Sequence, residues 1–531
     1  MEFVLPSVHP RVEDQLNLAS HGLRWVVPDA LTTWLGPDGA SVGFYQDIER
    51  TKREIARYSL KDAQQRYGEL VECLTDAMMT IMPYMQGHPW RVRPATIAKM
   101  LTNAAKGRNN LAKGVRALLG SIDGVMDEWF EREEVKAPIA AYSAGTFGPI
   151  TETGTGFHLT FLTGIHAWGV RRPVGGSGAF TQALAAAVRH HKGEIRTNAR
   201  VARITTRDGV AQGVVLDSGE QIAATDVICA VDPTTLLTKL VDPADLPQRT
   251  HDEINALQVG RYNVLYFDVE LALSARPRFP GYPDRDDNYL STLMLCPTMD
   301  YMRRSTLDGM RGTFTDEIPM ATLCSSVYDR SLVPAGSTGE TLKFYAFNTP
   351  IELADGRDWE DEKEKYFHNA MDHFELYAPR TRDLVIDAHL TAPPDFEQRY
   401  NVYGGITSMP TSRWPNSARH ARSRRWPGGK PPSSISGTAA PDHSRWPTSA
   451  GGPGGALHRQ FCVAANTHAP DKARQSSGAS RRRVRLSVTS ENHWCRRAVD
   501  TYLKTDAAVW GGGADSPPSS RAAVAAVAAA C

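Results

Sequence analysis

Residues 171–233 read RRPVGGSGAFTQALAAAVRHHKGEIRTNARVARITTRDGVAQGVVLDSGEQIAATDVICAVDP, and this stretch decides the fold class of the chain. It opens with a turn that contains Gly175, Gly176 and Gly178. Glycine tolerates positive φ angles and lets a ligand come close to the main chain. An apolar residue then recurs every four positions, at Phe180, Leu184 and Val188. This spacing predicts a helix over about residues 178–191 that buries one face on a sheet, with Ser177 as its cap.

The rest of the stretch predicts strands and tight turns. Residues 194–197, 201–206 and 211–216 have the composition of short strands, and the turns between them are expected at Asp208-Gly209 and over residues 217–220. Val227 to Val231 is an apolar run typical of a strand in the middle of a parallel sheet. Asp232-Pro233 is expected to end it, because proline cannot donate a hydrogen bond to the sheet.

The whole block resembles a known family. RPVGGSGA at 172–179 and EIRTNARVARI at 194–204 are similar to segments of the FAD-dependent phytoene desaturase and carotenoid isomerase-like oxidoreductases. These belong to the amine oxidase superfamily and have relatives with a pyridine nucleotide-disulfide oxidoreductase domain. The resemblance continues at residues 9–39, at IARYSLKDAQQRY (55–67), and through LTAPPDFEQRYNVYGG, which ends at Gly405.

The resemblance implies an α/β protein with a split, Rossmann-like FAD-binding domain and an α+β substrate domain. Flavin oxidoreductases of this type pass a hydride from a lipophilic small molecule to FAD, and the protein mainly positions the reactants. By the same resemblance, the main chain of Val201 contacts the adenine, and Gly175, Gly176 and Gly178 shape the loop near the flavin. It names no catalytic side chain.

Two family segments do not occur in this sequence. The family begins with a strand, a G-x-G-x-x-G turn and a following acidic residue that hold the FAD pyrophosphate and ribose. It ends with a glycine-rich turn and helix. We therefore expect an incomplete FAD-binding domain, which leaves two alternatives to an active flavoenzyme: a truncated, flavin-free and inactive remnant, and an interaction protein that uses a basic tail.

This interpretation divides the chain into five parts. Residues 1–58 are expected to be a remnant of the FAD-binding domain, and residues 59–170 a mainly helical part of the substrate domain. Residues 171–242 return to the FAD-binding domain. Residues 243–405 complete the substrate domain with an antiparallel sheet and helices, and residues 406–531 form the tail.

The tail differs from the rest of the chain in composition and charge. From Thr407 to Cys531 there are 18 Lys and Arg against 6 Asp and Glu, whereas residues 1–406 have 42 against 53. Pro, Gly, Ser and Arg dominate without helical or strand periodicity, so we expect a disordered tail. Arg481, Arg482, Arg483 and Arg485 would be the contact of a nucleic-acid-binding arm, but aromatic residues are sparse and no recognised binding module surrounds them. Translation of a shifted frame is the alternative.

The helical part contains two segments with open interpretations. Ser59 followed by Asp62 is typical of a helix start, and Leu70, Leu74 and Met78 then recur at helical spacing. The methionines from Met78 to Met85 are either core or the lining of a lipophilic channel. The basic amphipathic helix expected at residues 106–119 is either a solvated face or a peripheral contact with a membrane.

The sequence of the second part of the substrate domain predicts a sheet and a helix. Strands are expected at residues 263–269, 341–347 and 383–390, and a charged helix at 359–377. They suit an antiparallel substrate-domain sheet.

Other candidate residues carry little chemistry. Arg171-Arg172 are either near the flavin or in a surface loop, and His158 and His166 lack a third ligand with zinc spacing, so no metal site is predicted. Cys229 is expected to be a core residue. The seven cysteines show no C-x-x-C spacing, which indicates a reducing cytoplasm, and no apolar run reaches the length of a membrane span.

Overall fold

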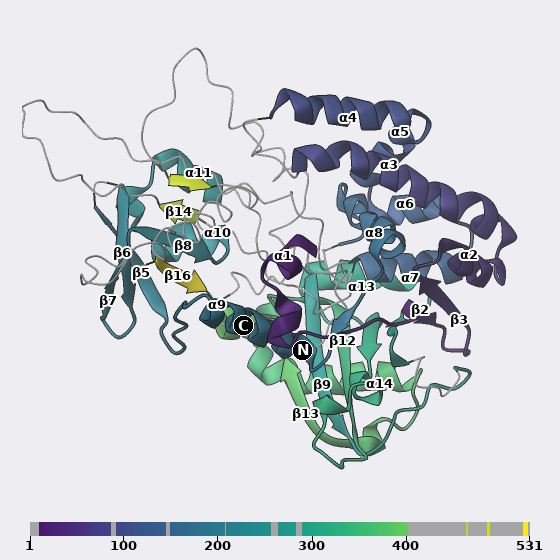
Figure 1. Cartoon of the computed structure of the whole chain (residues 1–531). Helices are drawn as coiled ribbons and strands as arrows, with labels where there is room; N and C mark the ends of the chain where they lie inside the picture. Colours follow the sequence, from purple (N-terminus) through teal and green to yellow (C-terminus); the bar gives the residue numbers. More distant parts are fainter. Residues whose placement is uncertain are drawn as a thin grey trace, which may run out of the picture.

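The computed structural model describes residues 10–85, 92–144, 149–207, 209–255, 264–282 and 289–401, together with three short strands between residues 463 and 528. A seven-stranded sheet with helices on both faces forms one end of the molecule, and a small antiparallel sheet lies at the other end (Figure 1). The fold is therefore mixed α/β, as predicted.

The seven-stranded sheet has the order β13-β9-β12-β11-β10-β2-β3. Every neighbouring pair is antiparallel except β10 and β2, which are parallel. Its strands, in that order, are Val385–Thr391, Val264–Leu273, Glu340–Pro350, Met320–Leu323, Thr292–Leu295, Ala30–Leu35 and Ser41–Tyr45. Strands β2 and β3 thus join the predicted substrate-domain sheet, although they precede it by more than 200 residues. The three strands predicted at residues 263–269, 341–347 and 383–390 correspond to β9, β12 and β13.

One face of this sheet packs against a single long helix, α14 (Trp359–Glu375). Trp359, Tyr366 and Phe374 of α14 share a buried cluster with Phe267 of β9 and Phe344 of β12. Phe344 and Phe374 are stacked with ring centroids 5.2 Å apart. Acidic residues in the first turn of α14 interact favourably with the positive end of the helix dipole. Asp358 caps the helix by accepting a hydrogen bond from the Glu360 amide.

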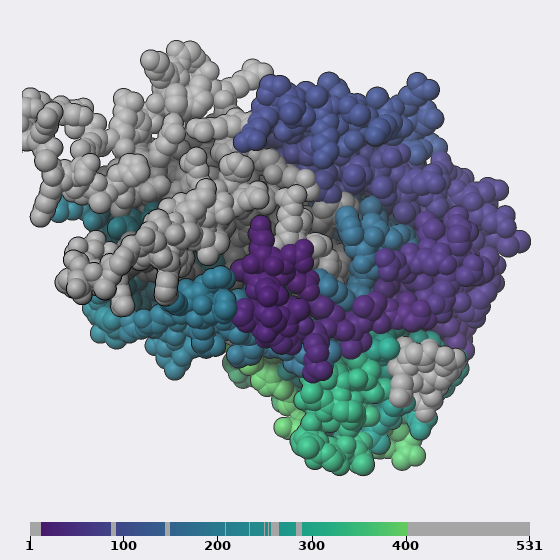
Figure 2. Space-filling view, viewed as in Figure 1, coloured from purple at the N-terminus to yellow at the C-terminus, as the bar shows by residue number. Residues whose placement is uncertain are grey.

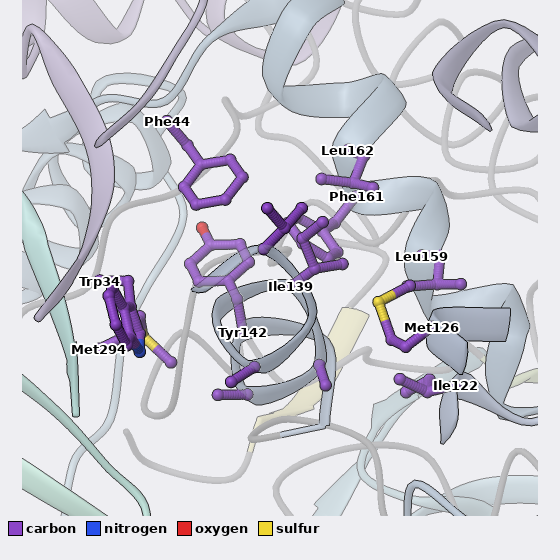
Figure 3. Packing of buried hydrophobic residues seen from close by; sticks show 14 of the residues in the cluster. Trp34, Phe44, Ile122, Met126, Ile139, Tyr142, Leu159, Phe161, Leu162 and Met294 are labelled. Atoms are coloured by element: carbon purple, nitrogen blue, oxygen red, sulfur yellow. The ribbon is translucent and has the colours of Figure 1, made fainter. Parts of the chain in front are cut away.

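The opposite face of β2, β10 and β11 packs against a layer of helices. Trp34 of β2 and Met294 of β10 lie in the same cluster as Tyr142 and Ile139 of α7, as Figure 3 shows. The helices of this half are α2 (Ile48–Ala56), α3 (Gly68–Met85), α4 (Pro94–Lys106), α5 (Arg108–Leu119), α6 (Ile122–Trp129), α7 (Glu133–Ala144), α8 (Thr160–Trp168) and α13 (Met299–Arg311). Most of the described residues between 59 and 170, which were expected to be mainly helical, lie in helices.

Helix starts in this half follow the sequence signals closely. The Ser59 hydroxyl accepts from the Asp62 amide at 3.0 Å, at the start of a π-helical segment over Asp62–Tyr67 that leads into α3. Leu70, Leu74 and Met78 are buried, and so are Met82 and Met85, which favours the core interpretation of this methionine group. The helix predicted over residues 106–119 is α5, since α4 ends at Lys106 and Gly107 separates the two helices.

The decisive stretch forms α9 and a separate small sheet. Helix α9 is Gly176–His190, and the hairpin of β5 (Val201–Arg207) and β6 (Val210–Leu216) continues into β7 (Gln221–Ala223) in the order β5-β6-β7. Strand β8 (Asp226–Ala230) follows. Gly219 has φ of 86° in the second predicted turn, and Asp208 of the first lies outside the described residues.

Three local predictions in this stretch are wrong. Gly175 is the N-cap of α9 and no side chain caps it, so Ser177 does not. Ala183 and Ala187 join Phe180 on the buried face while Val188 is exposed, because the buried stripe drifts from the four-residue spacing. Residues 194–197 form no strand: the chain turns there through Asn198, which has φ of 54°.

Strand β8 is paired on both sides. It is parallel to β16 (Val524–Ala528) and antiparallel to β14 (Val463–Ala465), which pairs in turn with β15 (Leu486–Val488). Strand β8 is thus internal to a sheet as predicted, but that sheet is mixed rather than parallel. Apart from these three strands, residues 406–531 lie outside the described residues, so their predicted disorder stays a prediction.

The remaining elements are short. They include α1 (Pro10–Gln15), the pair β1 (Trp25–Val26) and β4 (Arg172–Pro173), α10 (Pro233–Thr235), α11 (Gln248–Asn255) and α15 (Pro393–Tyr400). No described helix is long and apolar enough to cross a membrane.

Candidate functional site

The predicted glycine turn is bonded to the loop between β11 and β12 of the seven-stranded sheet. Gly175 and Gly176 have φ of 85° and 75°, which side chains other than glycine's strongly disfavour. The amide of Gly175 donates to Asp329 Oδ2 at 2.6 Å. Asp329 is buried and also accepts from the Ser331 hydroxyl at 2.6 Å. The turn therefore joins the start of α9 to the sheet, and its first amide already has a carboxylate partner.

Gly178 has a different environment. It lies in the first turn of α9, and a Cβ built on it would meet no atom within 4 Å. Packing against the rest of the protein thus does not require glycine here. Gly175, by contrast, needs its glycine for backbone conformation, and a Cβ there would lie 3.2 Å from that of Ala179.

The two arginines before the turn have opposite environments. Arg171 bonds to Glu13 and its guanidinium lies 4.1 Å from the centre of the Trp25 ring. Arg172 is fully buried, donates to the Ser325 hydroxyl and lies 5.2 Å from the centre of the Tyr328 ring. For Arg172 the surface-loop alternative is therefore wrong, since it is among the largest fully buried side chains.

One face of β9, β12 and β13 carries a row of charged residues. Lys343 of β12 is paired in register with Glu270 of β9, which is paired with His389 of β13. The Lys343 ammonium contacts Asp268 Oδ2 at 2.8 Å and Glu270 Oε1 at 2.5 Å. Asp268 and Lys343 are both buried, and Asp268 Oδ1 has no hydrogen-bond partner among the described residues. Asp268 and Lys343 thus form a buried ion pair, with the partly exposed Glu270 beside it.

Burial and mutual attraction set the protonation of this group. Burial raises the pKa of Asp268, and the neighbouring Lys343 only partly offsets this. Burial opposes the charge on Lys343, but Asp268 and Glu270 more than compensate and raise its pKa. The pKa of Glu270 is lowered: burial acts upward, and the Lys343 charge outweighs it. The lysine stays protonated between the two carboxylates.

This charged row continues toward the glycine turn. Tyr345 of β12 is paired in register with Asp268, and the Lys343 ammonium lies 5.1 Å from the centre of its ring. Burial raises the pKa of Tyr345 well above its usual value, and the positive charge of Arg172 acts in the opposite direction. Arg172 is the first residue of β4 (Arg172–Pro173), and the glycine turn begins two residues after this strand, at Gly175. The polar face of the sheet, Arg172 and the glycine turn are thus neighbours in space.

Val201, the predicted adenine contact, begins β5 at the edge of the three-stranded sheet. Its side chain is half-buried against the cluster of Val214, Leu216 and Val227. On its outer edge β5 pairs with no other strand among the described residues. A main-chain edge of this kind can exchange hydrogen bonds with an adenine, so the local geometry fits the adenosine end of FAD. The assignment of Val201 and the three glycines stays a prediction.

Both ring nitrogens of His166 form hydrogen bonds within the fold. Its Nδ1 lies 3.0 Å from the Gln46 carbonyl oxygen and its Nε2 lies 2.9 Å from the Tyr67 hydroxyl. Since a carbonyl can only accept, Nδ1 carries the proton and Nε2 accepts from Tyr67. Burial lowers the pKa of His166. In the described parts of the chain, no three His, Cys, Asp or Glu side chains gather in a way that could hold a metal ion.

The sequence reasoning missed Asp268, Lys343, Ser325 and Asp329. Asp268 and Glu270 alternate with apolar residues inside an otherwise apolar strand, and Lys343 stands in another. A charge at such a position signals a buried pair, because an unpaired one would be very costly. Ser325 and Asp329 gave no signal, since their contacts are made more than 150 residues away in the sequence.

Comparisons with known proteins find similarity to flavin-containing oxidoreductases. Residues 118–300 match the model of the family described as flavin containing amine oxidoreductase. The chain is 26% identical over 441 residues to the rat pyridine nucleotide-disulfide oxidoreductase domain-containing protein 2, covering 76% of this chain and 74% of that protein. It is 23% identical to a 4,4'-diapophytoene desaturase of Methylomonas sp over 46% of this chain and 44% of the relative.

A further relative is one of the limonene dehydrogenase subunits of Castellaniella defragrans, 26% identical over 51% of this chain and 50% of that protein. Among solved structures, an oxidoreductase from Methanosarcina mazei has a TM-score of 0.46 at 14% identity, covering 73% of this chain and 75% of its own. A putrescine oxidase variant has a TM-score of 0.42 at 12% identity, covering 75% and 74%. The matched residues include the glycine turn, α9 and β5 to β8, and the resemblance predicted from the sequence is confirmed: this chain is similar to the oxidoreductases of the flavin-containing amine oxidase superfamily.

Proposed function

We propose that this chain binds FAD and oxidises a lipophilic small molecule by hydride transfer to the flavin, in the manner of the phytoene desaturases. The observation that carries the proposal is the family match over residues 118–300, which includes the predicted adenine contact and the glycine turn. When bound, the flavin supplies the hydride acceptor. The chain itself would hold the adenine at the free edge of β5 and support the flavin end through the turn at Gly175, Gly176 and Gly178.

The names of two relatives support a hydrocarbon-like substrate. One is named a desaturase of 4,4'-diapophytoene and the other is part of a limonene dehydrogenase. We infer a dehydrogenation rather than an amine oxidation for this chain on that basis.

The charged row on the sheet would act by positioning. Lys343 is held between Asp268 and Glu270 and lies over the ring of Tyr345, whose pKa the charge of Arg172 acts to lower. Arg172 in turn precedes the turn whose Gly175 is held by Asp329. A rigid link of this kind would keep the substrate sheet and the cofactor turn at a fixed separation, which hydride transfer requires.

We also propose a reducing, cytoplasmic location. Cys73, Cys229 and Cys296 are buried and form no disulfide with any described residue. Burial raises the pKa of Cys73 to about 11 and that of Cys229 to about 12, so both stay protonated and unreactive. Cys229 fits the core role expected of it.

Anaerobic reduction of the bound flavin tests the proposed substrate class. The purified chain, loaded with FAD, would be mixed without oxygen with an isoprenoid hydrocarbon in detergent micelles or with putrescine. Bleaching of the flavin absorbance at about 450 nm by the hydrocarbon but not by the amine is the expected result. Bleaching by putrescine alone would favour an amine oxidase and exclude the hydrocarbon proposal.

A further inference from the structure

Strand β13 is the open edge of the seven-stranded sheet. It pairs with β9 on one side, and on its other side it pairs with no strand of the described residues (Figure 1). Its four residues 386–389 are all exposed. In Figure 2 the green atoms of the lower lobe, to which this edge belongs, lie at the surface. An exposed edge presents main-chain donors and acceptors with which another strand can pair.

Ala388 lies at the centre of this edge, and its main chain faces outward. Its amide donates to Oδ1 of the preceding Asp387 at 2.9 Å, a side chain of the same strand. Amides alternate between the two sides of a strand, so those of Asp387 and His389 point to β9 and that of Ala388 points away from it. The outward amide is therefore available to a second strand that replaces the Asp387 carboxylate as its acceptor.

Charges alternate across the sheet up to this edge. Lys343 of β12 is opposite Glu270 of β9, and Glu270 is opposite His389 of β13. Nη1 of Arg399, in α15, lies 3.2 Å from Nε2 of His389. Because a guanidinium can only donate, Nε2 accepts this hydrogen bond and Nδ1 of His389 carries the proton. The row thus ends in a hydrogen-bond donor beside a positive charge, and an acidic side chain would continue it.

We propose that two copies of this chain pair through β13, antiparallel and centred on Ala388. In this register Asp387 of one copy stands opposite His389 of the other, and the twofold symmetry repeats the contact. Residues 387 and 389 project to the same face of the sheet, because side chains alternate along a strand. Asp387 of the second copy is thus the acidic residue that continues the row, and the two Ala388 residues exchange main-chain hydrogen bonds.

A second copy fits this edge because the segment Asp387-Ala388-His389 is complementary to itself when it runs antiparallel. The same three residues supply both partners of each contact. The pairing with β9 is regular from Asp387 to Thr391, and its register shifts between Val385 and Asp387. The regular part of the edge is therefore short, and we expect a weak dimer in exchange with the monomer. The inference does not depend on the flavin.

Analytical ultracentrifugation of the full chain over a range of concentrations, with a reductant present, tests this pairing. We expect a reversible equilibrium between monomer and dimer. D387K and H389E should each weaken the dimer by more than about tenfold, because each symmetric dimer then contains two contacts that repel. An equimolar mixture of the two variants should dimerise again, since the substituted lysine then faces the substituted glutamate and the other contact is unchanged.

Two further variants test the main chain and serve as a control. A388P removes the outward amide, at a position where an edge strand tolerates proline, and should also weaken the dimer. E72K reverses an exposed acidic residue of α3 and should dimerise as the unmodified chain does. Far-ultraviolet circular dichroism confirms that every variant is folded. The proposal is overturned if the unmodified chain stays monomeric at every concentration, if D387K and H389E alone dimerise as E72K does, or if their mixture forms no more dimer than either variant alone.

Discussion

Gly175 is the residue on which the link between α9 and the seven-stranded sheet depends. Its positive φ angle allows its amide to point at Asp329, and its lack of a Cβ avoids Ala179. Gly178, three residues on, has neither constraint. The fold therefore requires glycine at position 175, whereas packing in the described structure does not require it at position 178.

The variant G175A is expected to lower the free energy of unfolding by about 1–2 kcal/mol, because alanine is strained at this φ angle. G178A should raise it by up to about 1 kcal/mol, since alanine favours helix over glycine. Denaturant unfolding measures both. Equal effects of the two variants would contradict the distinction.

His166 predicts a pH dependence of stability. Burial depresses its folded-state pKa below the usual 6.5, so the unfolded state binds the proton more tightly. The stability that the neutral ring contributes is present above about pH 6.5 and is lost as the pH falls toward the folded-state pKa. Protonation would also turn Nε2 into a donor facing the Tyr67 hydroxyl.

Thermal unfolding at about pH 7.5 and about pH 5 checks this expectation. The unmodified chain should lose more stability on acidification than H166Q, in which the amide can still donate to Gln46 and accept from Tyr67 without titrating. His373, whose pKa burial also lowers, remains in both proteins and so cancels in the comparison. An equal loss in both proteins would show that His166 does not carry the effect.

At the scale of elements, helices α3 and α5 approach each other through Gly114. A Cβ on this residue would lie 2.0 Å from the Cys73 carbonyl oxygen, so the helix backbones would have to separate. The same close approach places Lys113 beside Glu69. Helix α5 can thus pack on α3 only with glycine at this position.

We expect G114A to destabilise the protein by about 2–3 kcal/mol, in the range of overpacked cores. N109A, at an exposed position of α5, should change stability by less than about 0.5 kcal/mol. The unfolding free energies of the two variants are the measurement. A G114A protein as stable as N109A would mean that the helices are not held at this distance.

The predicted elements of the decisive stretch show what local sequence can specify. Helix α9, the β5–β6 hairpin and β8 were predictable because apolar periodicity and turn residues act over a few positions. The buried face of α9 was harder to predict. Ala183 and Ala187 lie on it but are only weakly hydrophobic, whereas the more hydrophobic Val188 is exposed. The contacts of Arg172 with Ser325 and of Gly175 with Asp329 depend on distant packing. No local pattern could have predicted them.

At the scale of the whole molecule, the fold was more predictable than the site. The substrate-domain strands β9, β12 and β13 were predictable from their apolar runs, but the addition of β2 and β3 beside β10 depends on a parallel pairing across more than 250 residues. The resemblance supplied Val201 and the glycines as site residues. The polar face around Lys343 emerges only when three strands are placed in register.

Loss of the Lys343 ammonium from that face is expected to lower the free energy of unfolding of the whole protein by a large amount. In K343M, Asp268 would be left as a buried carboxylate without the Lys343 ammonium, and the loss of one partner of a buried pair costs about 3–5 kcal/mol. Unfolding of K343M should therefore occur at clearly lower denaturant concentration than that of K365M, whose lysine is exposed. Similar midpoints for the two variants would contradict the pairing.

Binding of FAD to the full chain is the measurement that tests the central claim most directly. A fluorescence titration should show saturable binding of FAD that ADP displaces and FMN does not, because the adenine end is expected on the edge of β5. V201P, which removes one main-chain donor at the tolerated first position of an edge strand, should weaken binding by more than about tenfold, and V201A, which keeps that donor, should not. Absence of FAD binding, or equal binding by V201P and V201A, would contradict the account.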